Sequence, residues 1–306
     1  MSQAQFDGLL LIDKPQDITS HDVVARVRKA LRQKSVGHTG TLDPIATGLM
    51  ILVLGEATKL SDYLIAENKR YRVKARFGLR TDTLDRAGKV LEEHPCNLKE
   101  SDIRNETEQL EGVFEWPVPL FSATKVDGKK LYEHGREGTE IELPVKEMRF
   151  WDIDVESTSA HSADIALTCS KGGFIRTWVD QLGKNLKVGG IVDELRRLSV
   201  GGWSVDNAVT LEQLEAEGPG QSIIPMAQAL PGLKSILAGP REAKLVGHGQ
   251  IPKDVGARLI FEQKQAIETG KPVFVKVVSH EGDLLAILAA EPRQGLKIRR
   301  VFRGFP

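Results

Sequence analysis

One carboxylate lies in a segment with the composition of a functional loop. Asp43 precedes Pro44, and glycines occupy positions 37, 40 and 48. Proline fixes its own φ and pushes the residue before it towards extended backbone, while glycine permits tight turns and close approach of a ligand. A carboxylate in such a loop can act as a nucleophile or as a base. An Asp-Pro pair among glycines is more often an ordinary turn, so the neighbouring residues must decide between the two interpretations.

Residues 36–48 read Val-Gly-His-Thr-Gly-Thr-Leu-Asp-Pro-Ile-Ala-Thr-Gly. This string closely resembles the signature of the TruB family of tRNA pseudouridine synthases, and thirteen matched residues leave little room for an accidental match. The resemblance implies that Asp43 is the catalytic residue. The reaction breaks the bond between C1′ and N1 of a uridine, turns the base and joins C1′ to C5. Asp43 either attacks C1′ or removes a proton from C2′, and the sequence favours neither.

Two more segments resemble parts of the family's active site. The strand around Tyr71 resembles the segment with the active-site tyrosine, and Cys169–Thr177 the segment with the active-site arginine, Arg176. A tyrosine ring can stack on an unpaired base, which is worth about 1–3 kcal/mol, and its phenol can pass a proton. A guanidinium can hold a carboxylate through two hydrogen bonds and favours its ionised form. Taken alone, each segment favours a plainer interpretation: an inward-facing strand residue for Tyr71 and an exposed helix start for Arg176.

Residues 195–203 (Leu-Arg-Arg-Leu-Ser-Val-Gly-Gly-Trp) resemble the family segment whose leucine, here Leu195, lines the substrate pocket. The family usually has an Ala-His pair just upstream, where this chain has Gly190-Ile191. We expect this departure to alter the packing around Leu195 without loss of a catalytic group.

Residues 121–132 resemble the thumb loop that folds over bound RNA in the family, and we place this loop at about 119–143. Its Lys125, Lys129 and Lys130 fit contacts with phosphate, although a plain surface loop would have a similar composition.

Basic residues gather in three parts of the chain. Any single run is more often a solvated face, but two runs flank the Asp43 loop. The resemblance adds His38, as the histidine that inserts into the tRNA T loop, and Lys59, as a basic residue that touches RNA. We expect Arg300 in the C-terminal run to bind RNA as well. The three runs are Arg26, Arg28, Lys29, Arg32 and Lys34; Lys69, Arg70, Arg72, Lys74, Arg76 and Arg80; and Arg293, Lys297, Arg299, Arg300 and Arg303.

The composition is that of an ordinary globular protein. The chain has 306 residues, enough for two domains, of which 41% are hydrophobic and 27% charged. Lys and Arg together number 42, as do Asp and Glu, so an RNA-binding surface requires local sorting of charge. Cys96 and Cys169 form no CxxC pair, which argues against a disulfide framework or a zinc site and fits a reducing cytoplasm.

Several features are expected to be absent. The N-terminal residues lack a basic region followed by a long apolar stretch, so we expect no signal peptide. The longest apolar runs, Leu9–Ile12 and Leu49–Leu54, are too short to span a membrane. The sequence has no Walker loop, no GxGxxG motif after a strand and no metal-ligand cluster, which agrees with a reaction that needs neither cofactor nor metal. We expect a cytoplasmic monomer that requires no protein partner.

Strands outnumber tight βαβ units in the predicted order of elements. Gly8–Asp13 and Leu49–Leu54 have the composition of buried strands, and Tyr71–Phe77 alternates like a half-buried strand with a basic outer face. Val145–Val155 and Ala163–Thr168 predict paired strands. We therefore expect an α+β domain with a mainly antiparallel central sheet, which the resemblance identifies as the pseudouridine synthase fold. The predicted helices are one capped by Ser20, Glu56–Glu67, one capped by Ser101 and ending near Gly112, and Phe174–Leu186.

Residues 218–240 are rich in proline and glycine, which indicates a linker or an irregular surface connection. We expect a catalytic domain at 1–235 and a second, small domain at 241–306. In the latter, Pro272–Val278 and Asp283–Ala289 predict two strands, and a basic strand follows at Lys297–Phe302. A compact β-barrel fits this pattern and resembles the PUA-like C-terminal domain of bacterial TruB proteins.

The matched segments span residues 8–204 and imply an enzyme that isomerises uridine-55 in the T loop of tRNA. The uridine must leave its stack to reach Asp43, at a cost of a few kcal/mol. One alternative is a tRNA-binding folding helper without catalysis, against which the intact set of three active-site residues argues. Another is a glycosidase that hydrolyses the bond. Glycosidases usually need a second carboxylate, for which Asp82 and Asp85 are the candidates.

Overall fold

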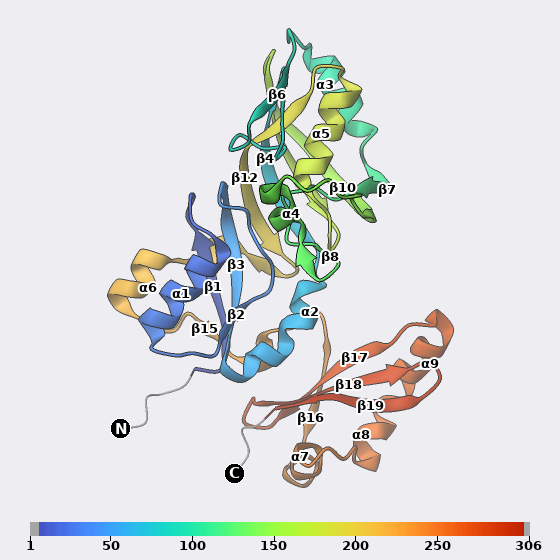
Figure 1. Cartoon of the computed structure of the whole chain (residues 1–306). Coiled ribbons are helices and arrows are strands. Elements are labelled where there is room, and N and C mark those ends of the chain that lie inside the picture. The colour runs from blue at the N-terminus through green and yellow to red at the C-terminus, as the bar shows by residue number, and fades with distance from the viewer. Residues whose placement is uncertain (1–5, 303–306) are drawn as a thin grey trace.

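The computed structural model describes residues 6–302 and has an α+β architecture with two main sheets (Figure 1). Within these residues, the larger sheet has eleven strands, eight of which follow the order β14-β1-β3-β12-β4-β11-β10-β7. The pairs β1·β14 and β3·β12 are parallel and the remaining pairs of this sheet are antiparallel, so the sheet is mixed. No helix in residues 6–302 combines the length and the apolar character that crossing a membrane would require.

The strands of the larger sheet and of two small hairpins precede those of the C-terminal sheet. They are β1 (Gly8–Lys14), β2 (Val36–His38), β3 (Ala46–Leu54), β4 (Lys69–Phe77), β5 (Leu79–Thr81), β6 (Val90–Glu93), β7 (Gly112–Pro117), β8 (Lys125–Val126), β9 (Lys129–Lys130), β10 (Val145–Thr158), β11 (Ser162–Cys169), β12 (Gly190–Val200), β13 (Trp203–Ser204), β14 (Val209–Thr210), β15 (Ile223–Ile224), β16 (Lys234–Ala238), β17 (Val273–Ser279), β18 (Leu284–Glu291) and β19 (Gly295–Val301).

The helices are short, and several of them pack on the sheets. Helix α5 lies against β12 and α3 against β10, while α1 and α6 lie side by side (Figure 1). The helices are α1 (Ser20–Leu31), α2 (Ser61–Ile65), α3 (Glu100–Glu108), α4 (Leu131–Glu137), α5 (Ile175–Asn185), α6 (Leu211–Glu217), α7 (Pro240–Gly247), α8 (Lys253–Ala257) and α9 (Ile260–Thr269), with 3-10 turns η1 (Gly55–Leu60), η2 (Val205–Asn207) and η3 (Met226–Gln228).

The two apolar runs predicted as buried strands form β1 and most of β3, which pair along their length. Both faces of these strands are covered, because alternate residues enter two different hydrophobic cores. Leu10 and Met50 belong to the core beneath α1 and α5, whereas Leu9 and Ile51 belong to a second core on the opposite face. This double burial explains why the runs are continuously apolar.

The other strand predictions of the catalytic part are confirmed. The strand predicted at Tyr71–Phe77 lies within β4, whose buried and exposed residues alternate. The strands predicted at Val145–Val155 and Ala163–Thr168 lie within β10 and β11, which pair. The helix predicted at Phe174–Leu186 is α5, and the one predicted at Glu56–Glu67 is the 3-10 turn η1 followed by α2.

Two predicted helix caps are wrong. Thr19 caps α1, because its hydroxyl accepts from the Asp22 amide at 3.1 Å and the Asp22 carboxylate accepts from the Thr19 amide at 2.8 Å. Ser20 is the first helical residue and is buried. Helix α3 begins at Glu100 after Lys99, so Ser101 lies inside its first turn.

The predicted C-terminal β-barrel is also wrong for the residues described. Strands β16, β17, β18 and β19 form an open four-stranded sheet in that order, with β16 added in parallel to β17. Three helices occupy most of residues 240–269, which leaves too few strand residues to close a barrel. Helix residues Ala243, Val246 and Val255, together with Leu259 between α8 and α9, fill the core on one face of this sheet.

The opposite face of the C-terminal sheet packs on the catalytic part. Leu284, Ile287 and Phe302 belong to the same hydrophobic core as Leu9 and Ile51. The sheet lies beside α2, at the end of the molecule opposite α3 (Figure 1). The two parts of the chain therefore share buried apolar surface.

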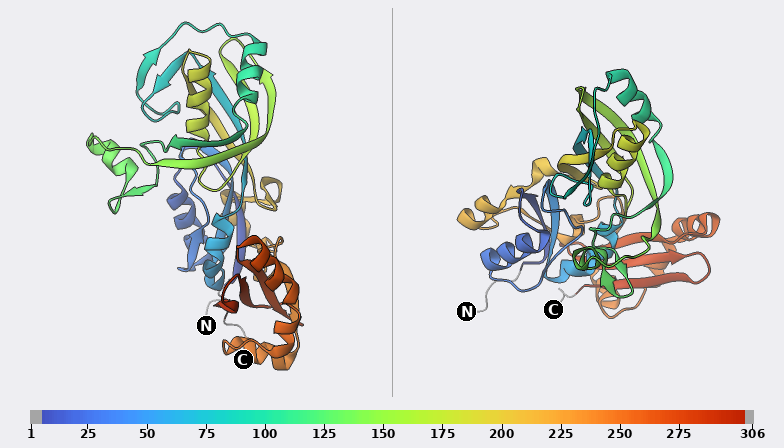
Figure 2. Two further views of the ribbon diagram at one scale, coloured as in Figure 1. Left: turned by 90° about the vertical axis from the view of Figure 1, so that its right-hand side faces the viewer. Right: turned by 45° about the horizontal axis from the view of Figure 1, so that its top comes forward.

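The segment predicted as a thumb folds as a hairpin and a short helix. Strands β8 and β9 pair around Asp127-Gly128, where both residues have positive φ, as hairpin turns of this kind require. Helix α4 follows, and the whole segment projects from the body of the molecule (Figure 2).

Candidate active site

Asp43 opens a tight turn between α1 and β3. The amide of Ala46 donates to the Asp43 carbonyl at 3.0 Å, and Pro44 occupies the second position of the turn, where its fixed φ fits. The Asp43 side chain is 32% exposed, so the carboxylate can meet a ligand without rearrangement of the backbone.

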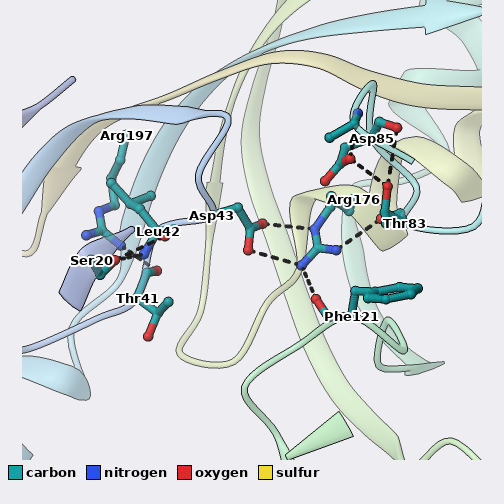
Figure 3. Close-up of polar contacts among 10 residues, drawn as sticks. Ser20, Thr41, Leu42, Asp43, Thr83, Asp85, Phe121, Arg176 and Arg197 are labelled. Carbon is teal, nitrogen blue, oxygen red and sulfur yellow. Dashed lines mark hydrogen bonds and ion pairs between the residues drawn. The ribbon is translucent and has the colours of Figure 1, made fainter. Parts of the chain in front are cut away.

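The Asp43 carboxylate faces the guanidinium of Arg176 on the first turn of α5 (Figure 3). Nε lies 2.9 Å from Oδ2 and Nη2 lies 3.2 Å from Oδ1, so both carboxylate oxygens are engaged. The guanidinium also donates to the carbonyls of Thr83 at 3.0 Å and Phe121 at 2.9 Å. Its side chain is only 5% exposed. Arg176 thus fixes the carboxylate and ties the Asp43 loop to the base of the thumb.

Three buried polar residues, Ser20, Lys14 and Arg197, form hydrogen bonds to the Asp43 loop on the side away from Arg176. Ser20 exchanges hydrogen bonds with the backbone of Leu42, donating at 3.0 Å and accepting at 2.9 Å. Lys14 donates to the carbonyls of Pro44 and Ala46, and burial lowers the pKa of its ammonium to about 8 although nearby Asp43 opposes the shift. These bonds fix the backbone on both sides of Asp43.

Arg197 completes this support from β12. Its guanidinium, almost fully buried, donates to the carbonyls of Leu49 at 2.7 Å and Gly40 at 3.1 Å. The backbone of the loop that carries Asp43 is therefore held by hydrogen bonds at several points, an arrangement that suits an active site that must hold a reacting group in one orientation.

A cavity of about 410 Å³ opens over the Asp43 carboxylate. Tyr71 and Leu195 line it from the adjacent strands β4 and β12, where Leu195 is paired with Val73 and with Ala46. Burial raises the pKa of the Tyr71 phenol, and the Arg197 guanidinium beside it opposes the rise. The structure thus brings together Asp43, Tyr71, Arg176 and Leu195, all four of the residues predicted for the catalytic pocket.

Asp43 is the one carboxylate among the described residues that line this cavity. Asp85, considered above as a second acid, accepts from the hydroxyl of Thr83 at 2.6 Å and the amide of Ala87 at 3.0 Å. Asp82 accepts from the amide of Lys89 at 2.8 Å. Both carboxylates fix the turn in which they lie and do not line the cavity.

Gly190, where the chain departs from the family's Ala-His pair, allows α5 to pack closely on the start of β12. A Cβ on Gly183 of α5 would lie 2.2 Å from the backbone nitrogen of Gly190, and one on Gly190 would lie 3.0 Å from the Val179 carbonyl. The two glycines let the helix approach the strand closely. Leu195 still lines the cavity with Asp43.

The residues predicted to bind RNA are not among those that line the cavity. Lys125 is exposed on the thumb hairpin, Lys129 forms an ion pair with Glu137, and Lys130 lies over the ring of Tyr132. The thumb itself reaches the cavity through Ser122, Ala123 and Thr124.

His38 and Lys59 lie outside the cavity. The His38 ring packs edge-on against His21 with centroids 5.9 Å apart, and burial, aided by His21, lowers its pKa. Lys59 forms an ion pair with Glu56 at 2.5 Å and lies 6.0 Å from the ring centre of Phe302, so it also joins the two parts of the chain.

At the C-terminus, the predicted RNA-binding residue Arg300 lies on β19, exposed and 3.6 Å from Asp62. Arg303, which belongs to the same basic run, lies outside the described residues.

Sequence reasoning missed two lysines at the cavity. Lys146 at the start of β10 and Lys171 in the loop before α5 both line it and are exposed. Lys171 lies within a matched segment, next to two glycines, which was an available signal. Nothing in the alternating strand pattern distinguished Lys146 from other outward-facing lysines.

Two protein-family models match consecutive parts of the chain. The family model described as TruB family pseudouridylate synthase (N terminal domain) matches residues 28–175. The model described as tRNA pseudouridylate synthase B C-terminal domain matches residues 176–226.

Three curated relatives are each called tRNA pseudouridine synthase B. The relative from Bdellovibrio bacteriovorus is 45% identical over 305 residues, which cover 98% of both chains. That from Clostridium kluyveri is 39% identical over 81% of this chain and 86% of its own. That from Salmonella typhimurium is 40% identical over 76% of this chain and 75% of its own.

Solved structures share the fold at lower sequence identity. An H/ACA RNP bound to a substrate RNA containing 2′-deoxyuridine matches with a TM-score of 0.70 at 19% identity, covering 97% of this chain and 85% of that chain. A Cbf5-Nop10-Gar1 complex matches with a TM-score of 0.67 at 20% identity, with the same coverage.

Proposed function

The chain belongs to the TruB family of tRNA pseudouridine synthases, and from this premise we propose that it converts uridine-55 in the T loop of tRNA to pseudouridine. It is an isomerase with the α+β fold of these enzymes. The observation that supports the proposed chemistry most directly is the pair of Asp43 and Arg176. A single carboxylate, partly exposed and held at both oxygens, lies in a cavity beside a tyrosine.

In the proposed reaction, the target uridine leaves its stack and enters the cavity over Asp43. Tyr71 and Leu195 supply a flat ring and an apolar wall for the base, and Arg176 keeps the carboxylate oriented through bonds to both of its oxygens. Asp43 then either attacks C1′ and displaces N1 of the base, or removes a proton from C2′ so that the base leaves as the C1′–N1 bond breaks. In both cases C5 of the turned base bonds to C1′, which releases Asp43 or returns its proton to C2′. The proton lost from C5 is balanced by one gained at N1. Both steps use the same carboxylate, and neither requires a redox partner or a group donor, because the product has the same atoms as the substrate.

We also propose how RNA reaches the site. Lys146 and Lys171 lie at the cavity and can contact the phosphates that flank the flipped uridine, while Lys125 and its neighbours on the thumb fold over the T arm. His38 fills the gap left by the flipped base. In this proposal the catalytic domain ends before β16, which pairs with β17, and a PUA-like domain that begins with β16 contacts the RNA farther from the reacting uridine.

The test is to incubate the full chain with unmodified tRNA and to map every modified position. The proposal predicts pseudouridine at position 55 and no other change. Cleavage of the glycosidic bond with an abasic product would indicate a hydrolase. Tight binding of tRNA without any product would indicate an RNA-binding protein without catalysis.

A further inference from the structure

A second cavity, of about 550 Å³, lies between the catalytic part and the C-terminal sheet. Helix α2 separates it from the cavity at Asp43. Ile65 at the end of α2 lines the Asp43 cavity, whereas Tyr63 and Ala66 line the second cavity. The two cavities therefore lie on either side of one short helix. We call the second one the α2 cavity.

The walls of the α2 cavity suit a flat aromatic ligand. Tyr63 of α2 and Phe274 of β17 meet edge to face, with ring centroids 5.4 Å apart and planes at 81°. Leu230 and Leu233, from the connection before β16, complete an apolar wall. Aromatic and aliphatic side chains arranged in this way accept an unstacked nucleobase, since every base has a π face and a hydrophobic surface.

Two consecutive arginines of β19 line the same cavity, which a regular strand would not permit, because successive side chains point to opposite faces. A β-bulge provides the exception. Ile287 pairs with Arg300 and Leu288 with Ile298, so Arg299 is the extra residue of the bulge. Bulges of this kind re-aim side chains, and here both guanidiniums border one cavity.

The charge on the lining limits what the α2 cavity can bind. Asp62 and Glu67 lie in the same lining as Arg299 and Arg300. Arg299 also forms an ion pair with Glu291 at the end of β18. Arg300 lies 3.6 Å from Asp62, both exposed, so a phosphate can displace this contact. Because these acids offset the arginines, a ligand with one negative charge, such as a phosphodiester-linked nucleotide, fits the cavity better than a di- or triphosphate.

We propose that the α2 cavity binds one unpaired nucleotide of the tRNA whose uridine enters the Asp43 cavity. The base packs against Tyr63 and Phe274, and its phosphate is bound by Arg299 and Arg300. This inference rests on the proposed function, because it assigns to the same substrate a second contact on the far side of α2.

The first test is photochemical cross-linking of the full chain to unmodified tRNA, followed by identification of the attached peptide and nucleotide. The proposal predicts a nucleotide other than uridine-55 attached to a peptide that contains Tyr63 or Phe274. Cross-links confined to peptides around Asp43 and the thumb would contradict it.

The second test compares tRNA affinity of Arg300→Gln with that of Arg241→Gln, which removes the same charge from an exposed position on α7 outside the cavity. We expect Arg300→Gln to bind about tenfold more weakly than wild type and Arg241→Gln within about twofold of it. Equal affinities for the two variants would contradict the proposal.

Measuring wild-type turnover in the same samples distinguishes a failure of the proposed function from a failure of the α2-cavity proposal. Absence of pseudouridine would overturn the proposed function. Normal wild-type turnover together with equal affinities of the two variants would overturn the α2 cavity alone.

A third experiment tests whether the nucleotide bound in the α2 cavity belongs to tRNA or is a free nucleotide. The methyl phosphodiesters of AMP and UMP, which carry one negative charge as a nucleotide within RNA does, are each titrated into the wild-type chain, with and without tRNA. Displacement of either by tRNA supports the proposal, whereas binding that tRNA leaves unchanged would assign the cavity to a free nucleotide and overturn it.

Discussion

At the scale of single residues, Asp43 and Arg176 form one functional unit. A buried guanidinium is costly unless it is paired, and Arg176 engages both oxygens of Asp43 and two backbone carbonyls. The carboxylate in turn keeps one orientation while remaining partly exposed. The planar shape of the guanidinium, and not its charge alone, provides this arrangement.

We therefore predict that Arg176→Lys lowers the single-turnover rate about 100-fold or more while tRNA affinity changes little. Arg196→Lys is the matched control, because Arg196 holds Asp13 through two similar bonds at 3.0 and 2.7 Å but does not line the cavity. Similar rates for the two variants would place Arg176 outside the chemistry.

A second prediction concerns the phenol of Tyr71. Phenylalanine keeps the ring that packs on the base and removes only the hydroxyl. If the phenol passes a proton, Tyr71→Phe binds tRNA normally but its single-turnover rate falls at least 100-fold. A rate close to that of wild type would restrict Tyr71 to stacking. Rapid-quench measurements with radiolabelled tRNA provide both quantities.

The predicted catalytic residues were found from sequence because each lies in a recognisable short segment. Asp43, Tyr71, Arg176 and Leu195 meet in one cavity although they are separated along the chain. Lys146 was missed because its contribution depends on where β10 begins relative to the thumb, which local pattern does not specify. Lys59 has a contact with Phe302 that only the packing of the two parts reveals.

At the scale of elements, α1 positions the catalytic loop. Its first residue, Ser20, satisfies both the amide and the carbonyl of Leu42, next to Asp43. Sequence reasoning assigned the helix cap to Ser20 because either of two adjacent hydroxyl residues can cap a helix. Asp22 decides between them, since it stands three residues after Thr19 and closes the capping box with it.

Because Thr19 caps the helix and Ser20 binds the catalytic loop, substitutions can test the two roles separately. Ser20→Ala leaves two buried backbone groups of Leu42 without partners, so we predict a loss of about 1–3 kcal/mol in the free energy of unfolding and at least a tenfold lower rate. Thr19→Ala should cost about 1 kcal/mol through the lost cap and leave the rate within about twofold of wild type. Chemical denaturation measures the free energy of unfolding of each variant, and single-turnover assays measure its rate. Equal single-turnover rates for Ser20→Ala and Thr19→Ala would show that Ser20 does not position the loop.

At the scale of the whole molecule, the C-terminal sheet and the catalytic part share a core. Ile287 and Phe302 are packed with residues of β1 and β3. Deleting residues 241–306 would expose these apolar strands, so truncation is a poor test of what the C-terminal part binds. The predicted barrel failed for a related reason: sequence pattern identified β17, β18 and β19 but not the helices that cover their other face.

The shared core predicts cooperative unfolding. Ile287→Ala removes buried apolar volume and should cost about 2–5 kcal/mol. We expect calorimetry to show a single transition at a lower temperature for the whole chain. Ile267→Ala on α9 is the control, because this side chain is 65% exposed and should leave the transition unchanged. Two separate transitions, of which only one moves, would mean that the parts unfold independently.

The most direct test of the proposed function is the product formed by Asp43→Asn on unmodified tRNA under single-turnover conditions. Asparagine keeps the shape of the side chain but is neither a strong nucleophile nor a base. We predict that wild type converts uridine-55 to pseudouridine and that the folded variant binds the same tRNA without forming detectable product. Conversion by Asp43→Asn at a rate within about tenfold of wild type would contradict the assignment of Asp43 as the catalytic carboxylate.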